Sequence, residues 1–171
     1  MPYLLDSDVL AAASRIHYHP DFCQLFWDWI DVGHSHGEFF SIDKVHGELK
    51  AGDDKDPLSQ WCQRPTLSDF FLPTRTATAK WRDLANWAST RSPIYLPAAQ
   101  SKFLSVNSAD AWLIAFAAAN AGWTIVTNEV AAPASRRDIK LPDAAQAQGV
   151  KTMSMSTLLR THAKANFTFK K

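Results

Sequence analysis

Short apolar segments alternate with helical stretches along this chain, and this alternation limits the fold more than any other feature of the sequence. Candidate strands lie at residues 2–5, 39–42, 123–127 and 150–155, written PYLL, FFSI, WTIVT and VKTMSM. Strands that are separated by helices must be joined by crossover connections, which produce parallel pairing. We therefore predict an α/β fold, a three-layer α/β/α sandwich around a central, mainly parallel sheet.

Capping residues and helical periodicity delimit the segments between these strands. Residues 21–32 carry apolar side chains at helical spacing, and Gly33 is the predicted stop. Asp56 and Pro57 are predicted as the N-cap and first turn of another helix. Ser108 is predicted to cap a helix that Gly122 closes. Together with the helix that starts at Asp56, the predicted helices cover residues 11–14, 21–32, 43–51, 74–90, 109–121 and 142–148. A last helix is predicted to start at Ser156.

The composition is that of one soluble domain. The chain has 171 residues, of which 46% are hydrophobic and 20% are charged. We place a single domain at residues 1–165 and expect a loosely held basic tail at 166–171. No apolar run approaches the roughly 20 residues of a membrane span, so no membrane partner is expected. Cys23 and Cys62 lack the spacing of a metal site and are expected to be reduced thiols, which indicates a cytoplasmic protein.

Acidic residues fall near the predicted ends of the strands, where ligands of open parallel sheets bind. Asp6 and Asp8 follow the first strand, and Asp110 lies in the first turn of the helix that leads into WTIVT. The polar residues of interest are Asp6, Asp8, Glu48, Asp110, Asn128 and Glu129. They converge if the first strand and the WTIVT strand are neighbours in the sheet, which the sequence alone does not show.

A converged set of carboxylates would need compensation. Two unit charges about 4 Å apart repel by roughly 4 kcal/mol at an effective dielectric near 20. Several such pairs would rival the total stability of a domain, about 5–15 kcal/mol. Protons or a divalent cation would relieve this repulsion, and an all-oxygen ligand set favours Mg²⁺ or Mn²⁺. The acids can also be explained one by one without a shared site. The helix dipole stabilises an acid in the first turn of a helix, such as Asp110, and Glu48 fits the solvent-exposed face of a helix.

The motifs and their order resemble the PIN-domain nucleases. The resemblance covers about residues 2–159 and rests on LLDSD, SIDKVHGEL, NSADAWLIAFA before WTIVTNE, and a late strand. It is closest to a PIN-like subgroup with an aromatic FWDWI helix, a stretch such as GDDKDPLSQW, and IKLPDAAQAQGV near the end. This resemblance implies a PIN-like fold and a metal-dependent ribonuclease.

Site residues follow from the resemblance position by position. It implies that Asp6, Glu48, Asp110 and Glu129 are catalytic and bind Mg²⁺ or Mn²⁺, with Glu129 standing where Asp is more usual. Further candidates for the site are Ser7, Asp8, Asn128 and Asp143. Candidates for contacts with substrate phosphates are Arg15, Arg136 and Arg137. The bound ions would activate a water for attack on the phosphorus.

Partners also follow from the resemblance. Many small PIN proteins are toxins of toxin–antitoxin pairs, so the resemblance implies an RNA substrate and an antitoxin, for which a helix-turn-helix DNA-binding protein is one candidate. PIN proteins often dimerise, which makes a homodimer a further expectation.

Other interpretations of the same residues remain open. A non-catalytic PIN-like protein that binds a regulator would share the fold. LLDSDVL also resembles the start of a haloacid-dehalogenase-type phosphatase, with Asp6 as nucleophile, Asp8 as general acid and GDDKD as metal motif, although that motif falls too early in the chain. The histidine pairs His17–His19 and His34–His36, with His46, suggest zinc, but neither cysteine is spaced to join them.

Overall fold

A five-stranded sheet forms the centre of the protein in the computed structural model, which describes residues 1–53 and 55–169. The strand order is β3-β2-β1-β4-β5, and every pair of neighbours is parallel. The strands are β1 (Tyr3–Leu5), β2 (Phe39–Ile42), β3 (Phe71–Leu72), β4 (Thr124–Val126) and β5 (Lys151–Met153). The predicted α/β fold with a central parallel sheet is confirmed.

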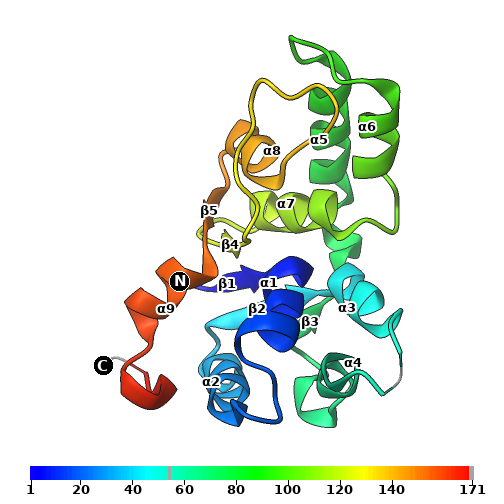
Figure 1. Cartoon of the computed structure of the whole chain (residues 1–171). Coiled ribbons are helices and arrows are strands. Elements are labelled where there is room, and N and C mark those ends of the chain that lie inside the picture. The colour runs from blue at the N-terminus through cyan, green and yellow to red at the C-terminus, as the bar shows by residue number, and fades with distance from the viewer. Residues whose placement is uncertain (54, 170–171) are drawn as a thin grey trace.

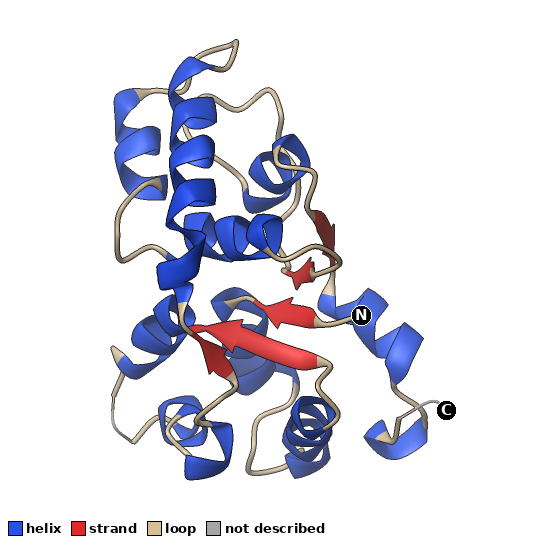
Figure 2. Ribbon diagram, turned by 180° about the vertical axis from the view of Figure 1, so that it is seen from behind, coloured by secondary structure: helices blue, strands red, loops and turns tan. Residues whose placement is uncertain are grey.

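Helices cover both faces of this sheet, so the fold has three layers. Figure 1 shows α7 on one side of β1 and α2 on the other, with α5, α6 and α8 beyond α7, and Figure 2 shows the same arrangement from behind. The α-helices are α1 (Ser7–Ala12), α2 (Gln24–Ser35), α3 (Asp43–Lys50), α4 (Pro57–Cys62), α5 (Thr78–Thr90), α6 (Pro97–Phe103), α7 (Ala109–Ala119), α8 (Leu141–Ala147) and α9 (Met155–His162). Shorter turns are the π-helical η1 (Ala13–His17) and the 3₁₀ turns η2 (Pro65–Leu67), η3 (Thr74–Ala77) and η4 (Ala165–Phe167).

The central position of α7 follows from its composition. Its sequence, ADAWLIAFAAA, is apolar on nearly every side after the first turn, and such a helix is stable only when other elements surround it. It packs on β2 and β4 and against α5 and α8. Among the residues that the structure describes, no helix has the length and apolar character needed to cross a bilayer.

Gly33 does not end α2, as the spacing predicted, but lies inside it. The helix continues to Ser35 and is followed by Gly37, whose φ of 72° suits glycine. Gly33 packs against β2, where an added Cβ would overlap the ring of Phe39. The residue therefore serves the close approach of helix and strand rather than the helix end.

Other boundaries also differ from the predictions. The first helix begins at Ser7 and runs into η1, where residues 11–14 were expected, and Ser154 rather than Ser156 caps α9 by accepting from Thr157 N at 3.2 Å. The strand β3 and the helix α6 were not predicted, because a strand of two residues has no periodicity and the α6 segment is only seven residues long. The predicted start of α4 is confirmed, since Asp56 Oδ1 accepts from Leu58 N at 3.0 Å.

Two aromatic residues near the C-terminus pack on the core. The ring of Phe167 lies 5.6 Å from that of Phe26, and the ring of Phe169 lies 5.4 Å from that of Trp29. The expected loosely held tail at 166–171 is therefore not found at Phe167 and Phe169. Lys170 and Lys171, the last residues of that predicted tail, lie outside the described residues.

Gly33→Ala should destabilise the protein, because the new methyl group overlaps the Phe39 ring and must push α2 away from β2. We expect a loss of about 1–3 kcal/mol in the free energy of unfolding, the usual effect of overpacking. Urea denaturation followed by circular dichroism measures it. Gly47→Ala is the matched control: it lies in α3 with no atom within 4 Å of the new Cβ, so it should be neutral or stabilising. Equal stabilities for the two variants would contradict this account of Gly33.

Candidate functional site

The acids predicted to converge depend on the pairing of β1 with β4, and the structure contains this pair. The two strands are parallel, with Leu5 opposite Val126. From β1 the chain first builds β2 and β3 on one side and later β4 and β5 on the other. The topological switch point, where open parallel sheets bind ligands, therefore lies at the carboxyl ends of β1 and β4.

Asp6 lies at this switch point, directly after β1, and is only 2% exposed. One carboxylate oxygen accepts from Ser7 N at 2.7 Å, which caps α1, and the other accepts from the Thr127 hydroxyl at 3.0 Å. Burial raises its pKa well above the usual value, and the charges of Asp8 and Asp110 raise it further, while the Thr127 hydrogen bond acts in the opposite direction. Asp6 is thus both a helix cap and a member of a group of acids.

Asp8 lies on α1 and faces the residues after β4. Its Oδ2 accepts from Asn128 N at 3.0 Å and lies 3.5 Å from the hydroxyl of Thr127. Burial is the main cause of its raised pKa, with a contribution from the charge of Glu129, and the Asn128 hydrogen bond partly offsets both. Thr127 also accepts from Glu129 N at 3.1 Å, so it joins β1, α1 and the β4 end.

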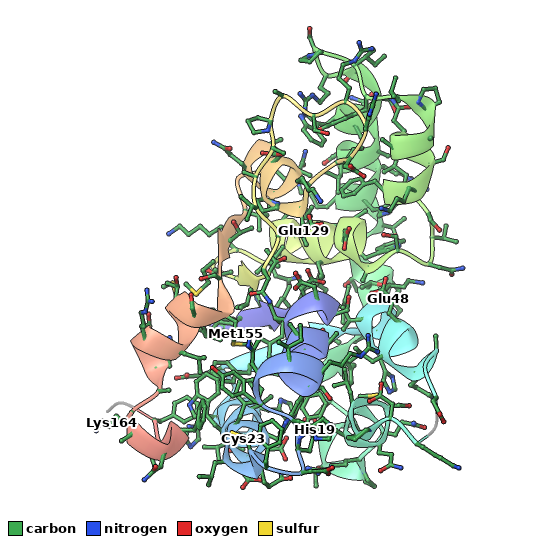
Figure 3. The ribbon with its side chains drawn as sticks, viewed as in Figure 1. His19, Cys23, Glu48, Glu129, Met155 and Lys164 are labelled. Atoms are coloured by element: carbon green, nitrogen blue, oxygen red, sulfur yellow. The ribbon has the colours of Figure 1, made fainter. Side chains whose placement is uncertain are left out.

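Asp110 lies in the first turn of α7 and interacts electrostatically with the other acids. Its pKa is raised to about 6, mainly by burial and further by the nearby charges of Glu129, Glu48 and Asp8. Figure 3 shows the labelled Glu48 on α3 and Glu129 on the loop after β4. We call these mutually interacting residues the acidic cluster; its members are Asp6, Asp8, Glu48, Asp110 and Glu129.

Glu48 holds the start of α7. Its Oε1 accepts from Ala109 N at 2.9 Å, across 61 positions of sequence. Ser108 occupies the N-cap position, as predicted, but its side chain makes no capping hydrogen bond. A carboxylate at a helix start satisfies a free N–H group and is favoured by the helix dipole, so Glu48 takes the role that the sequence assigned to Ser108.

Glu129 accepts a hydrogen bond from the start of α8. Its Oε2 accepts from Leu141 N at 2.8 Å, and its Oε1 lies 3.2 Å from Nζ of Lys140, whose pKa it raises. Compared with the Asp more usual at this position of the resembled family, the longer side chain allows this reach to α8. Any ligand role for Glu129 would require an exchange of these partners.

Three further candidates from the sequence lie on or beside the loop between β4 and α8. Asp143 is 8% exposed and accepts from Ala132 N at 2.8 Å, which closes this loop. Arg136 donates from Nε to the carbonyl of Ile94 at 2.9 Å, and Arg137 is exposed on the same loop. Within residues 1–53 and 55–169, the structure shows no hydrogen bond or ion pair between these three residues and the acidic cluster.

Arg15 and Ser7 lie closer to the acids. With Asp8 and Glu48 they line a hollow of about 200 Å³. The guanidinium of Arg15 is 3.5 Å from the carboxylate of Asp56, an exposed contact that leaves most of the cation accessible. A phosphate in this hollow would meet Arg15 beside the acidic cluster.

The sequence analysis did not single out Thr127 or the lysines near Asp110. Thr127 follows β4 directly beside Asp6, and the strand order would have revealed it. Lys102 and Lys140 line a small hollow of about 50 Å³ together with Asp110 and Glu129. Nothing in the local sequence indicates this position for either lysine, because α6 and the loop before α8 bring them there.

The donor set suits a hard divalent cation in type and charge. All members of the acidic cluster are carboxylates. Burial is the main cause of the raised pKa values of Asp6 and Asp110, and neighbouring negative charges, which a cation would offset, raise them further. Among the described residues, however, no three His, Cys, Asp or Glu side chains are already arranged as a metal-ligand group. Within the described part of the chain, Asp110 fits a cation most directly, because the other four carboxylates of the cluster each accept from a backbone N–H group.

In a buffer that contains chelator, Asp110→Asn should raise the melting temperature at pH 7.5 but not at pH 4. The pKa of Asp110 is about 6 in the folded protein and about 3.9 in the unfolded chain, so the folded state binds more protons between these values and loses stability as the pH rises through them. The full penalty, roughly 3 kcal/mol at most, is present above pH 6. Thermal unfolding of both proteins from pH 4 to 8 measures it.

Asp83→Asn is the control for this experiment, because Asp83 is an exposed residue of α5, and it should change stability little at any pH. A gain for Asp110→Asn that is the same at pH 4 and pH 7.5 would show that Asp110 carries no such electrostatic penalty.

Comparison with known proteins identifies a family. No curated protein and no solved structure was found to match the chain. A family model described as a domain of unknown function, DUF4411, matches residues 3–167, a span that includes all five strands and the acidic cluster. The chain therefore belongs to the DUF4411 family.

Proposed function

We propose that this chain is a metal-dependent ribonuclease that hydrolyses RNA phosphodiester bonds with Mg²⁺ or Mn²⁺ at the acidic cluster. One observation carries the proposal: Asp6 is buried directly after β1 at the switch point of the sheet, and the charge of Asp110, at the start of α7, contributes to the raised pKa of its carboxyl group. Buried like charges at a ligand-binding position are characteristic of functional sites.

A divalent cation explains this arrangement better than protons alone. Asp110 has a pKa of about 6, so it is mostly ionised at neutral pH, and its charge then lies near those of Glu129, Glu48 and Asp8. A bound Mg²⁺ or Mn²⁺ supplies Lewis acidity for attack of water on a phosphodiester. Asp6 and Asp110 would hold the ion, and the Thr127 hydroxyl fixes the orientation of the Asp6 carboxylate.

Basic side chains border both hollows at the acidic cluster, which supports binding of a phosphodiester there. Arg15 borders the hollow beside Asp8 and Glu48, and Lys102 and Lys140 border the hollow beside Asp110. Charge-assisted contacts from these side chains would hold the phosphates on either side of the scissile bond and offset the repulsion from the acids. RNA cleavage also agrees with the resemblance of the sequence motifs to PIN-domain nucleases, and the toxin role with an antitoxin partner is part of the same proposal.

A second candidate function is a PIN-like protein that binds a regulator without cleaving RNA. The contacts of Glu48 with Ala109 N and of Glu129 with Leu141 N favour it, because carboxylates used as helix caps need no metal. The phosphatase interpretation has less support: in its supposed metal motif, GDDKD, Asp56 caps α4, and Asp54 lies outside the described residues.

Asp6→Asn should abolish RNA cleavage without unfolding the protein. The amide oxygen of Asn can still accept from Ser7 N, and its NH₂ group can donate to the Thr127 hydroxyl oxygen, but the charge that binds the ion is lost. We expect at least about a 100-fold loss in the rate of cleavage of a labelled single-stranded RNA in Mn²⁺, consistent with loss of a directly ligating group. Asp21→Asn, an exposed acid away from the sheet edge, is the control and should cleave normally. Full activity of the Asp6 variant, with contaminating nuclease excluded, would refute the assignment.

Mn²⁺ should raise the melting temperature of the wild-type protein and have much less effect on Asp110→Asn. An ion that binds only the folded state at 100 times its dissociation constant adds about 2.7 kcal/mol, which corresponds to a shift of several degrees in a domain of this size. Differential scanning fluorimetry with and without Mn²⁺ measures the shift. An equal rise in both proteins would mean that the ion binds elsewhere.

A further inference from the structure

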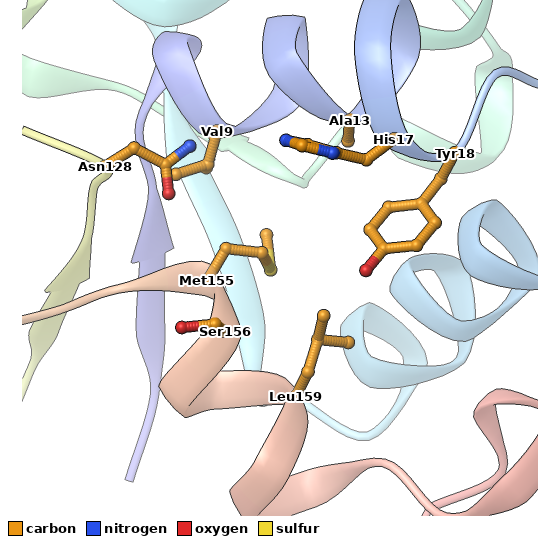
Figure 4. Close-up of a pocket in the computed structure, with 8 residues that line it drawn as sticks. All are labelled: Val9, Ala13, His17, Tyr18, Asn128, Met155, Ser156 and Leu159. Atoms are coloured by element: carbon orange, nitrogen blue, oxygen red, sulfur yellow. The ribbon is translucent and has the colours of Figure 1, made fainter.

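A pocket of about 370 Å³ opens beside the acidic cluster, between η1, α9 and the residue Asn128 that follows β4. Figure 4 shows its lining residues, which come from three separate parts of the chain. The volume is within the range of pockets that hold small organic ligands. Neither the metal chemistry nor the phosphate contacts proposed above use this pocket.

The inner wall of the pocket is apolar and ordered. Val9 and Ala13 are each 1% exposed and Met155 is 7% exposed, so these side chains form a packed wall. The ring of Tyr18 stacks on that of Phe26, with centroids 4.5 Å apart and planes 18° apart, and is thereby held in place. Apolar walls with a fixed aromatic ring suit a flat, weakly polar group such as a nucleobase.

The rim of the pocket is polar. His17, Asn128 and Ser156 are exposed, and each carries groups that can donate to or accept from the edge of a base. His17 ends the π-helical turn, in which Tyr18 N donates to Ala13 O at 2.7 Å. Such turns occur frequently at functional sites, where they alter the direction of side chains.

The pocket and the acidic cluster share a wall. Asn128, on the rim, donates from its backbone N to Asp8 at 3.0 Å, and Val9 is the next residue after Asp8. A polynucleotide with one phosphate at the acidic cluster could therefore place a neighbouring base in the pocket, provided that the base is unpaired.

We propose that this pocket binds an unpaired base of single-stranded RNA next to the scissile phosphate. The inference rests on the ribonuclease function proposed above and adds to it a site for one unpaired base of the RNA beside the cleaved bond. Stacking of the base against apolar and aromatic side chains supplies affinity, and His17 and Asn128 contact the edge of the base.

A binding experiment tests the pocket independently of cleavage. The probes are single-stranded RNA pentamers with 2-aminopurine at one position each, titrated against protein that carries Asp6→Asn so that the RNA is not cut. Ser156→Trp, on the exposed rim, fills the pocket, and Ser89→Trp on the exposed side of α5 is the matched control. We expect about tenfold weaker binding, or more, for Ser156→Trp, since loss of base stacking has effects of this size. The control should bind normally, and equal binding by the two variants would overturn the proposal.

A cleavage experiment, with Asp6 intact, separates this proposal from the ribonuclease itself. The substrates carry an abasic nucleotide at successive positions around the cleavage point. We expect kcat/KM to fall about tenfold when the abasic nucleotide occupies one position, and this dependence should vanish in Ser156→Trp. Cleavage that no abasic position affects would overturn the base pocket and leave the ribonuclease intact. Pocket-dependent binding without any cleavage would support the pocket and refute the ribonuclease.

Discussion

The parallel pairing of β1 with β4 determines where the candidate site lies. Because the two strands point in the same direction and Leu5 is opposite Val126, the next residues, Asp6 and Thr127, leave the sheet side by side. The chain leaves both strands at this edge of the sheet. Helix α7, which precedes β4, packs on β2 and β4. Acids that are distant in the sequence are brought together by this one register.

Four of the five members of the acidic cluster also accept a hydrogen bond from a backbone N–H group. Asp6 accepts from Ser7, Asp8 from Asn128, Glu48 from Ala109 and Glu129 from Leu141. These contacts favour the ionised carboxylates and offset part of their mutual repulsion. The local roles are therefore compatible with a common site, and they explain how a small domain can hold so many acids before any cation binds.

The electrostatic penalty is greatest at Asp6 and Asp110, whose pKa values are raised first by burial and then by the charges of neighbouring acids. Protein interiors usually avoid such charges, and exceptions occur mainly where a ligand completes the site. The adjacent pocket, with its apolar wall and polar rim, has the complementary character: it could hold the uncharged part of a ligand whose charged part lies near the acids.

The fold class could be predicted from the sequence because apolar strands and amphipathic helices have distinct periods and the helix cap at Asp56 depends only on nearby residues. Short elements such as β3 were missed, because two residues carry no period. Gly33 was misjudged, since a glycine that permits close packing against Phe39 looks the same in sequence as one that ends a helix.

For the site, the sequence by itself determined which residues are acidic and that several follow strands or start helices. Only the tertiary structure decided that β1 and β4 are neighbours, that Glu48 rather than Ser108 holds the start of α7, and that Asp143 serves a loop. The reason is physical: strand order and contacts between different elements, such as that of Glu48 with Ala109 across 61 positions, depend on the packing of the whole chain, whereas capping and periodicity depend on residues a few positions apart.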